Sequence, residues 1–315
     1  MKDNIPAAAA AQLRRVLTGK DEVITLTLAA LLAGGHILLE DQPGTGKTTL
    51  ALAVSKVFGI DHRRIQLTPD TVASDITGYA AYDRRSEEFR YHPGAAMTNL
   101  LLADELNRTS GKTQAALLEA MEEGSVTVDG ITRELPQPFC VIATQNPVGQ
   151  TGTNELPLSQ LDRFMIRLRP GFPDKQALRK ILTDRASSDP LDSVTPVCDG
   201  ETLKSVISDC SGIFVSDSVY DYVCELTDRV NRSESIRQPI SPRGALQLCK
   251  AARAGAYLDG RDHVVPADIR ACLLPVCAHR IVLDPSARLS GETAEGLLRK
   301  VMKETKSPDD RRSGR

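Results

Sequence analysis

Residues 37–50 read Ile-Leu-Leu-Glu-Asp-Gln-Pro-Gly-Thr-Gly-Lys-Thr-Thr-Leu, an apolar strand that runs into a glycine-rich loop and then into a helix. The glycines let backbone N–H groups turn inward around phosphate oxygens, and the positive end of the helix dipole points at the same anion. Lys47 would neutralise the outer phosphates, and Thr48 would offer its hydroxyl to Mg²⁺. The alternative is a glycine-rich strand–helix turn without a ligand, but a chance match to Gly-Lys-Thr is uncommon between a strand and a helix. The stretch therefore predicts a nucleotide-binding loop, with contacts from Gly44, Thr45, Gly46, Lys47, Thr48 and Thr49.

Bulk composition limits the class of protein. The 315 residues suit one large domain or two ordinary ones. A net charge of −2 gives no electrostatic footprint for nucleic acid or for an anionic membrane. The longest apolar stretch, residues 26–39, is interrupted by two glycines and is too short to span a bilayer, so no membrane insertion is expected. Seven cysteines without paired metal-ligand spacing favour reduced thiols in a cytoplasmic protein.

Apolar, strand-like runs alternate with helical periodicity in the first half of the chain. The strand-like runs lie at residues 36–40, 63–67, 100–104, 139–144 and 164–169. Such alternation predicts an α/β fold with a parallel sheet that is covered by helices on both faces. Two segments break the alternation and are expected to be hairpins, 78–92 with a charged tip and 124–135 with a turn at Asp129-Gly130.

The pattern becomes helical from about residue 173, where Pro-Asp is typical of a helix start. We therefore expect a nucleotide-binding αβα domain over residues 1–172 and a smaller, all-α domain over residues 173–303. The charged residues 304–315 are expected to form a disordered tail.

An Asp-Glu pair ends the apolar run at 100–104. Beside a phosphate-binding loop, Asp104 would hold Mg²⁺, directly or through water, and Glu105 would orient and polarise the attacking water. The pair alone would more often be a solvated strand end. Its place one strand–helix unit after the loop favours the hydrolytic interpretation.

Three further polar residues are candidates for the same reaction. Asn146 follows an apolar strand and could hydrogen-bond the γ-phosphate or the lytic water, although alone it suits a turn before proline. Arg163, in Leu-Asp-Arg-Phe, could supply a cation to the transferring phosphoryl group, or it could pair with Asp162 on the surface. Arg243, in Ser-Pro-Arg-Gly, could reach the phosphates from the helical domain, or it could belong to a capping turn.

The ordered set of motifs resembles the AAA+ ATPases and, within them, the MoxR family. The resemblance runs from about residue 10 to 303, and its segments are residues 35–48, 68–78, 101–108, 112–123, 143–147, 161–164 and 241–243. Two positions depart from the usual patterns. Asp41 stands where the general loop motif begins with glycine, although an acidic residue there is not foreign to MoxR-like sequences, and Leu106 stands where isoleucine is usual. Neither change removes a catalytic group, so an active ATPase is expected.

The resemblance implies a role for each candidate residue. It implies that Asn146 is sensor 1, that Arg163 is an arginine finger acting on the adjacent subunit, and that Arg243 is sensor 2. It also implies an AAA+ core whose helix-2 insert is 78–92 and whose pre-sensor-1 hairpin is 124–135, followed by a helical lid.

Other residues receive less specific interpretations. Residues 17–20 resemble the segment that contacts adenine in such proteins, and Arg108 is a candidate for facing a neighbouring subunit's nucleotide. His36, the pair His279-Arg280, and Cys272 with Cys277 are expected to pack or to cap helices rather than to bind metal.

The resemblance further implies ATP and Mg²⁺ as cofactors and a ring homo-oligomer, usually a hexamer. A chaperone-like role in maturing or remodelling a protein client is implied as well, with a von Willebrand factor A domain protein as a possible adaptor or client. The ATPase subunit of a metal chelatase is the alternative, since its catalytic residues would be the same.

Two other functional hypotheses agree less well with the sequence. A DNA-acting regulator would need a net positive stripe on its hairpins, but the charges of 78–92 balance and 124–135 contains a single base, Arg133. A nucleotide-binding scaffold that does not hydrolyse is disfavoured by Glu105, Asn146 and Arg163.

Overall fold

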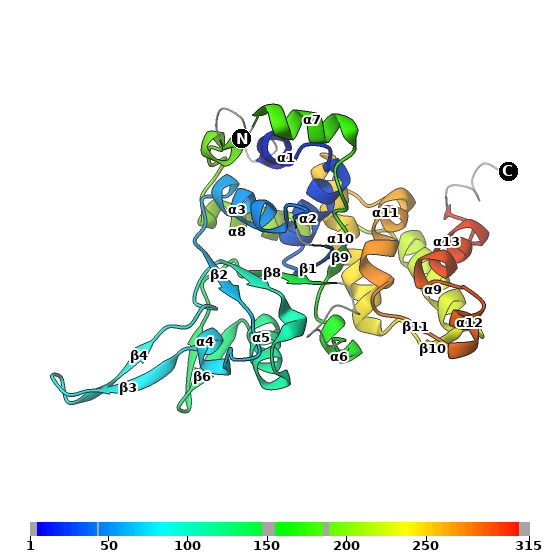
Figure 1. The fold of residues 1–315 in the computed structure, drawn as a ribbon. Coiled ribbons are helices and arrows are strands. Elements are labelled where there is room, and N and C mark those ends of the chain that lie inside the picture. The colour runs from blue at the N-terminus through cyan, green and yellow to red at the C-terminus, as the bar shows by residue number, and fades with distance from the viewer. Residues whose placement is uncertain (1–4, 43, 147–154, 185–188, 309–315) are drawn as a thin grey trace. The chain divides into compact units, whose positions relative to one another are not determined.

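The computed structural model describes residues 5–42, 44–146, 155–184 and 189–308. The chain divides into two compact units, which Figure 1 shows with their elements labelled. The first unit comprises Met1–Ile24, His36–Arg163 and Leu168–Ser205. The second comprises Thr25–Gly35, Phe164–Arg167 and Val206–Arg315.

Helices and short strands alternate along the described chain. The strands are β1 (Ile37–Glu40), β2 (His62–Gln66), β3 (Tyr79–Asp83), β4 (Glu88–His92), β5 (Leu100–Asp104), β6 (Ser125–Val128), β7 (Ile131–Glu134), β8 (Cys140–Gln145), β9 (Ile166–Leu168), β10 (Ile236–Gln238) and β11 (Val282–Leu283). The α-helices are α1 (Ile5–Val16), α2 (Asp21–Leu32), α3 (Lys47–Val57), α4 (Ala73–Thr77), α5 (Gly111–Glu123), α6 (Leu158–Leu161), α7 (Lys175–Asp184), α8 (Gly200–Ser211), α9 (Asp217–Asn231), α10 (Pro242–Leu258), α11 (Pro266–Cys277), α12 (Pro285–Leu289) and α13 (Ala294–Glu304). Two 3₁₀ helices are η2 (Leu106–Arg108) and η3 (Pro190–Ser193).

A five-stranded sheet in the order β2-β5-β8-β1-β9 confirms the predicted parallel architecture. The pairings β2–β5, β5–β8 and β8–β1 are parallel. Every residue of β5 and β8 is buried, because strands in the middle of a parallel sheet are covered on both faces and read as continuous apolar runs. Since the carboxyl ends of parallel strands meet at one edge, the polar residues that end β1, β5 and β8 lie together there.

The two predicted hairpins are confirmed. β3 and β4 pair antiparallel from Tyr79↔His92 to Asp83↔Glu88, and Figure 1 shows this ribbon projecting from the first unit. β6 and β7 also pair antiparallel, and their turn residues Asp129 and Gly130 both have positive φ, 51° and 75°. Positive φ at both central residues is what a two-residue type I′ turn requires, and Asp-Gly supplies it at low cost.

The described residues between 173 and 205, namely 173–184 and 189–205, pack in the first unit, although the sequence assigned them to the second domain. Gln12 Nε2 donates to Thr195 Oγ1 (3.0 Å), and Lys56 Nζ donates to Leu191 O (3.0 Å). The backbone N–H of Val197 donates to Val57 O (2.7 Å). These long-range bonds attach the segment to α1 and α3, and helical periodicity carries no signal for them. The boundary between the functional domains stays a prediction.

The second unit is mainly helical, as expected for a lid. Helices α9, α10, α11 and α13 pack against one another. The unit also contains the short antiparallel pair β10–β11, which the sequence did not predict because strands of three and two residues are too short for a period-two pattern. Thr305 and Ser307 are buried, so ordered structure continues past residue 304, and the rest of the predicted tail, 309–315, lies outside the described residues.

Candidate functional site

The glycine-rich loop joins the end of β1 to the start of α3, as the sequence predicted. Gly44 and Gly46 have φ of 85° and 89°, in the left-handed region where a side chain would be strained. Lys47 Nζ donates to the carbonyl oxygens of Asp41 (2.6 Å) and Gln42 (3.0 Å). Burial lowers the pKa of Lys47, although Asp41 and the carboxylates of the Asp-Glu pair oppose this shift.

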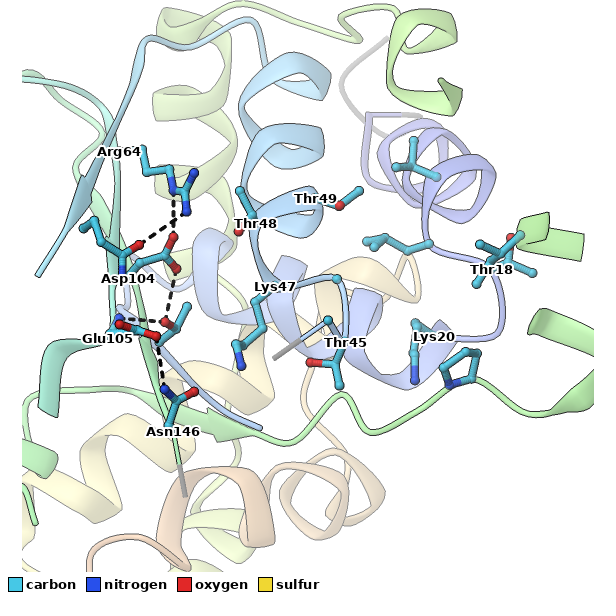
Figure 2. A pocket seen from close by; sticks show the side chains of 18 residues that line it. Thr18, Lys20, Thr45, Lys47, Thr48, Thr49, Arg64, Asp104, Glu105 and Asn146 are labelled. Atoms are coloured by element: carbon cyan, nitrogen blue, oxygen red, sulfur yellow. Dashed lines mark hydrogen bonds and ion pairs between the residues drawn. The ribbon is translucent and has the colours of Figure 1, made fainter. Parts of the chain in front are cut away.

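A cavity of about 470 Å³ opens beside this loop, within the size range of small-molecule sites. Figure 2 shows its lining, with the loop residues on one side and the polar ends of β5 and β8 on the other. Predicted residues that line it are Gly44, Thr45, Gly46, Lys47, Thr48, Thr49, Asp104, Glu105 and Asn146. The opposite end is lined by Val16, Leu17, Thr18, Lys20, Pro173 and Ile181.

Asp104 is the last residue of β5 and is 6% exposed. Its Oδ1 accepts a hydrogen bond from Thr144 Oγ1 (3.1 Å), and its Oδ2 forms an ion pair with Arg64 Nε (2.7 Å). The carboxylate is therefore fixed from both neighbouring strands, β2 and β8.

Glu105 adopts a left-handed backbone conformation, with φ 60° and ψ 47°, that is rare for a residue with a side chain. Its Oε1 accepts from Asn146 Nδ2 (3.2 Å), and its Oε2 pairs with Arg108 Nη1 (2.6 Å). Burial opposes ionisation, but the hydrogen bonds from Arg108 and Asn146 outweigh it and lower the pKa of Glu105. Such backbone strain concentrates at active sites, where the surrounding structure holds it in place.

Asn146 follows β8 and is 8% exposed. Its carbonyl accepts from Asn107 Nδ2 (3.1 Å), and its N–H donates to Asn107 Oδ1 (3.4 Å). This reciprocal pair ties the end of β8 to η2, so the amide that contacts Glu105 is attached to a fixed backbone.

Sequence reasoning missed three residues of this site. Arg64 and Thr144 hold Asp104, while Asn107 holds Asn146. Arg64 lies on the exposed edge strand β2, and only the pairing of Arg64 with Leu102 and of Gln66 with Asp104 brings it to the metal-ligand candidate. The sequence contains no signal for that strand order.

The two predicted arginines lie elsewhere. Arg163 Nη1 donates to Leu118 O (2.8 Å) and pairs with Glu122 Oε2 (2.6 Å), both on α5, and it does not line the cavity of its own chain. Arg243 is the second residue of α10 in the second unit. Their roles as arginine finger and sensor 2 stay predictions.

Arg108 bonds Glu105 within its own chain, as described above. The prediction that it faces a neighbouring nucleotide also stays open.

The histidines that were expected to pack are buried. His36 Nδ1 accepts from Val141 N (3.0 Å), and its Nε2 lies 3.0 Å from Met121 O. Arg280 donates to Phe164 O (2.7 Å), and burial, with Arg280 and Arg167 nearby, holds the pKa of His279 well below its usual value. Among the residues that the structure describes, no three His, Cys, Asp or Glu side chains are placed to share a metal ion.

None of the helices in the described part of the chain is long and apolar enough to cross a membrane.

Comparison with known proteins agrees with this geometry. A family model described as "ATPase family associated with various cellular activities (AAA)" matches residues 36–166, and one described as "AAA lid domain" matches residues 230–301. The uncharacterized protein YeaC of Bacillus subtilis is 45% identical, over 95% of this chain and 93% of its own length. Chaperone MoxR1 of Mycobacterium tuberculosis is 34% identical, over 94% of this chain and 81% of its own length.

A crystal structure of a candidate ATPase from Cytophaga hutchinsonii superposes with a TM-score of 0.90. It is 30% identical and covers 97% of this chain and 96% of its own. The matched models and this structure define an ATP-hydrolysing AAA domain with an AAA lid. Together with the MoxR relatives, they show that the chain belongs to the MoxR family of AAA+ ATPases. Membership of the AAA+ family also supports assembly into an oligomeric ring.

Proposed function

We propose that this chain is the subunit of a hexameric, Mg²⁺-dependent ATPase ring that remodels or matures a protein client in the cytoplasm. The observation that carries the catalytic part is the placement of Glu105. Its carboxylate lies in the wall of the loop cavity, is held by Asn146 and Arg108, and has a lowered pKa. An ionised carboxylate in this position can orient and polarise a water molecule for attack on the γ-phosphate of ATP.

The loop residues provide the binding half of this reaction. The N–H groups at the start of α3 and the ammonium of Lys47 would bind the β- and γ-phosphates. Lys47 Nζ would exchange the loop carbonyls of Asp41 and Gln42 for phosphate oxygens, which are stronger acceptors because they carry charge. Water attack on the γ-phosphorus then releases ADP and phosphate. Glu105 accepts a hydrogen bond from the attacking water and takes its proton as the new P–O bond forms.

The residues present fit Mg²⁺. The hydroxyl of Thr48 and the carboxylate of Asp104 line the same cavity, and this ion prefers oxygen ligands while it keeps several of its own waters. When bound, Mg²⁺ neutralises charge that develops on the phosphate oxygens. Arg64 now occupies one oxygen of Asp104, so metal binding through that oxygen would require Arg64 to move aside.

A ring explains why Arg163 is absent from the cavity of its own chain. It is anchored to α5 by Leu118 O and Glu122, and as an arginine finger it would complete the cavity of the adjacent subunit. A finger supplied by a neighbour is worth roughly 10³–10⁵ in rate, so hydrolysis would depend on assembly.

The surface of the β3–β4 hairpin favours a protein client. Tyr79, Tyr82 and Phe89 are 53%, 54% and 75% exposed, and the rings of Tyr82 and Phe89 lie 5.6 Å apart. Exposed aromatic side chains bind apolar polypeptide segments, whereas phosphate backbones need clustered cations. The relative named Chaperone MoxR1 supports this class of client. A von Willebrand factor A domain protein as adaptor or client rests on family resemblance alone.

The test of the catalytic proposal is the variant Glu105→Gln. We expect phosphate release to fall by about 10²–10⁴-fold while ATP binding persists, because the amide keeps the shape but loses the charge that polarises water. Glu119→Gln, an exposed carboxylate on α5, is the matched control and should hydrolyse ATP like the wild type. Wild-type protein that releases no phosphate, or Glu105→Gln protein that releases it at the wild-type rate, would refute the proposal.

Mixing two inactive variants tests the ring. Glu105→Gln subunits retain Arg163, and Arg163→Ala subunits retain Glu105, so one kind of hybrid interface has both groups. In a random equimolar mixture about one interface in four is intact, and activity should recover to roughly a quarter of wild type. No recovery in mixed rings of confirmed size would rule out catalysis in trans by Arg163.

The Glu105→Gln ring also tests the client. ATP-bound rings that do not hydrolyse should retain a protein client in a pull-down, and replacing Tyr82 and Phe89 with serine should release it. Retention of nucleic acid instead would contradict the proposed client class.

A further inference from the structure

Asp41, which stands where the general loop motif has glycine, bonds the phosphate loop to a distant segment of the chain. Asp41 Oδ1 accepts from the N–H of Gln42 (2.7 Å), and its Oδ2 accepts from the N–H of Gly171. Gly171 lies 130 positions further along the chain, in the segment between β9 and α7. The side chain therefore joins the start of the loop to a second segment, while its negative charge still acts on Lys47 within the loop.

A second bond reinforces this connection. Glu40 Oε2 accepts from Arg169 Nε (2.8 Å) and Nη2 (2.7 Å), and its Oε1 accepts from Gln145 Nε2 (2.9 Å). Arg169 is 57% exposed, whereas Glu40 is 13% exposed. Solvent weakens an ion pair with such an exposed partner, so the Asp41 bond is the stronger of the two connections.

The same segment is held from its other side. Lys20 Nζ donates to the carbonyl oxygens of Pro170 (2.6 Å) and Gly171 (2.8 Å). We call the set formed by Lys20, Glu40, Asp41, Arg169 and Gly171 the clasp. It fixes residues 169–171 between the start of the phosphate loop and the turn that follows α1.

The clasp borders the end of the cavity that is remote from Glu105. Pro173 follows the clasped segment by two residues and lines this end, together with Val16, Leu17 and Ile181. Gly19 approaches α7 so closely that an added Cβ would lie 2.8 Å from Ala177 Cβ. This mostly apolar wall suits a nucleoside, whereas the loop suits phosphates. Because the phosphates and nucleoside of one ligand are covalently joined, the distance between wall and loop determines whether both bind at once.

We propose that Asp41 is a positioning residue that sets the affinity for the nucleoside part of the ligand. It holds residues 169–171, and with them Pro173 of the apolar wall, at a fixed distance from the phosphate loop. This inference rests on the proposed ATP binding. The Asp41 carboxylate joins the loop to Gly171, and a glycine at position 41 would have no side chain to form this bond.

The test compares a nucleotide with a phosphate chain that lacks a nucleoside. For Asp41→Gly, which restores the general motif, we expect the Kd of ADP to rise about tenfold, the equivalent of one lost hydrogen bond to a charged group. The Kd of inorganic tripolyphosphate should not rise, because the glycines and Lys47 of the loop remain and the variant removes a negative charge that acts on Lys47. Hydrogen exchange in the peptide that covers 169–173 should accelerate. Asp129→Asn, in the β6–β7 turn, is the control and should leave both dissociation constants unchanged.

Each outcome decides the matter. Equal weakening of ADP and tripolyphosphate would show that Asp41 acts on the phosphate loop, and no weakening of either would show that the aspartate is a tolerated variation; both results overturn the inference. If Asp41→Gly does not fold, Asp41→Ala serves, since it also removes both acceptors and should give the same selective loss. Failure of the wild type to bind ADP would instead refute the proposed function, and the inference with it.

Discussion

Replacing Thr144 with valine removes one hydroxyl and leaves the size and branching of the side chain almost unchanged. Thr144 is 2% exposed, and its hydroxyl makes two hydrogen bonds at the centre of the site. It donates to Asp104 Oδ1 (3.1 Å) and accepts from the N–H of Glu105 (2.9 Å). Thr144 thus joins the candidate metal ligand and the candidate base to the same strand.

The magnitude follows from these two bonds. A hydrogen bond to a charged group contributes about 1.5–3 kcal/mol, and a buried donor left without an acceptor costs about 1–3 kcal/mol. The Glu105 N–H is only partly buried and Arg64 still holds Asp104, so we take a combined loss of about 3 kcal/mol. For a unit of this size that loss lowers the thermal midpoint by roughly 6–12 °C.

The assay is thermal unfolding followed by circular dichroism at one fixed protein concentration, since ring assembly makes the midpoint depend on concentration. The control is Thr144→Ser, which keeps the hydroxyl and loses only a methyl group, worth about 1 kcal/mol. We also expect the ATPase kcat of Thr144→Val to fall by about tenfold or more, since the Asp104 carboxylate and the Glu105 backbone each lose one contact that positions them. If the valine variant is as stable and as active as the serine variant, the hydroxyl does not organise this site.

Two further predictions concern the rest of the chain. Burial holds the pKa of His279 well below 6.5, the ordinary value that it has in the unfolded chain. Below pH 6.5 the unfolded chain therefore binds a proton that the folded chain excludes. The free energy of unfolding then falls by up to about 1.4 kcal/mol for each pH unit of acidification. His279→Gln should therefore lose less of its thermal midpoint than wild type between about pH 7.5 and pH 5.5, and equal losses would contradict the assignment. At the base of the β3–β4 hairpin, a Cβ on Gly94 would clash with the backbone of Gly78 and Ile76, whereas one on Gly111 would meet nothing within 4 Å. Gly94→Ala should thus cost about 1–3 kcal/mol, measured by urea unfolding, and Gly111→Ala should be neutral or stabilising; the reverse order would show that the hairpin base is not packed as described.

Local patterns were enough to predict much of this protein. The loop at residues 41–48, the strands before Asp104 and Asn146, and the turn at Asp129-Gly130 were identified from apolar runs and turn chemistry. These features depend on neighbours in sequence, because a strand, a tight turn and a helix start each need particular residues at short spacing. The pairing of Asp104, Glu105 and Asn146 with the loop also followed, since parallel strands bring their carboxyl ends to one edge.

Tertiary structure alone decided which distant side chains complete the site. Arg64 reaches Asp104 because β2 lies beside β5, and Asp41 reaches Gly171 across 130 positions. Arg163 bonds α5, and residues 190–197 attach to α1 and α3, through contacts that no periodicity encodes. The physical reason is the same in each case. Strand order and loop paths are set by burial of the whole core, and a short sequence window records the local chemistry of a residue but not the partner that folding brings to it.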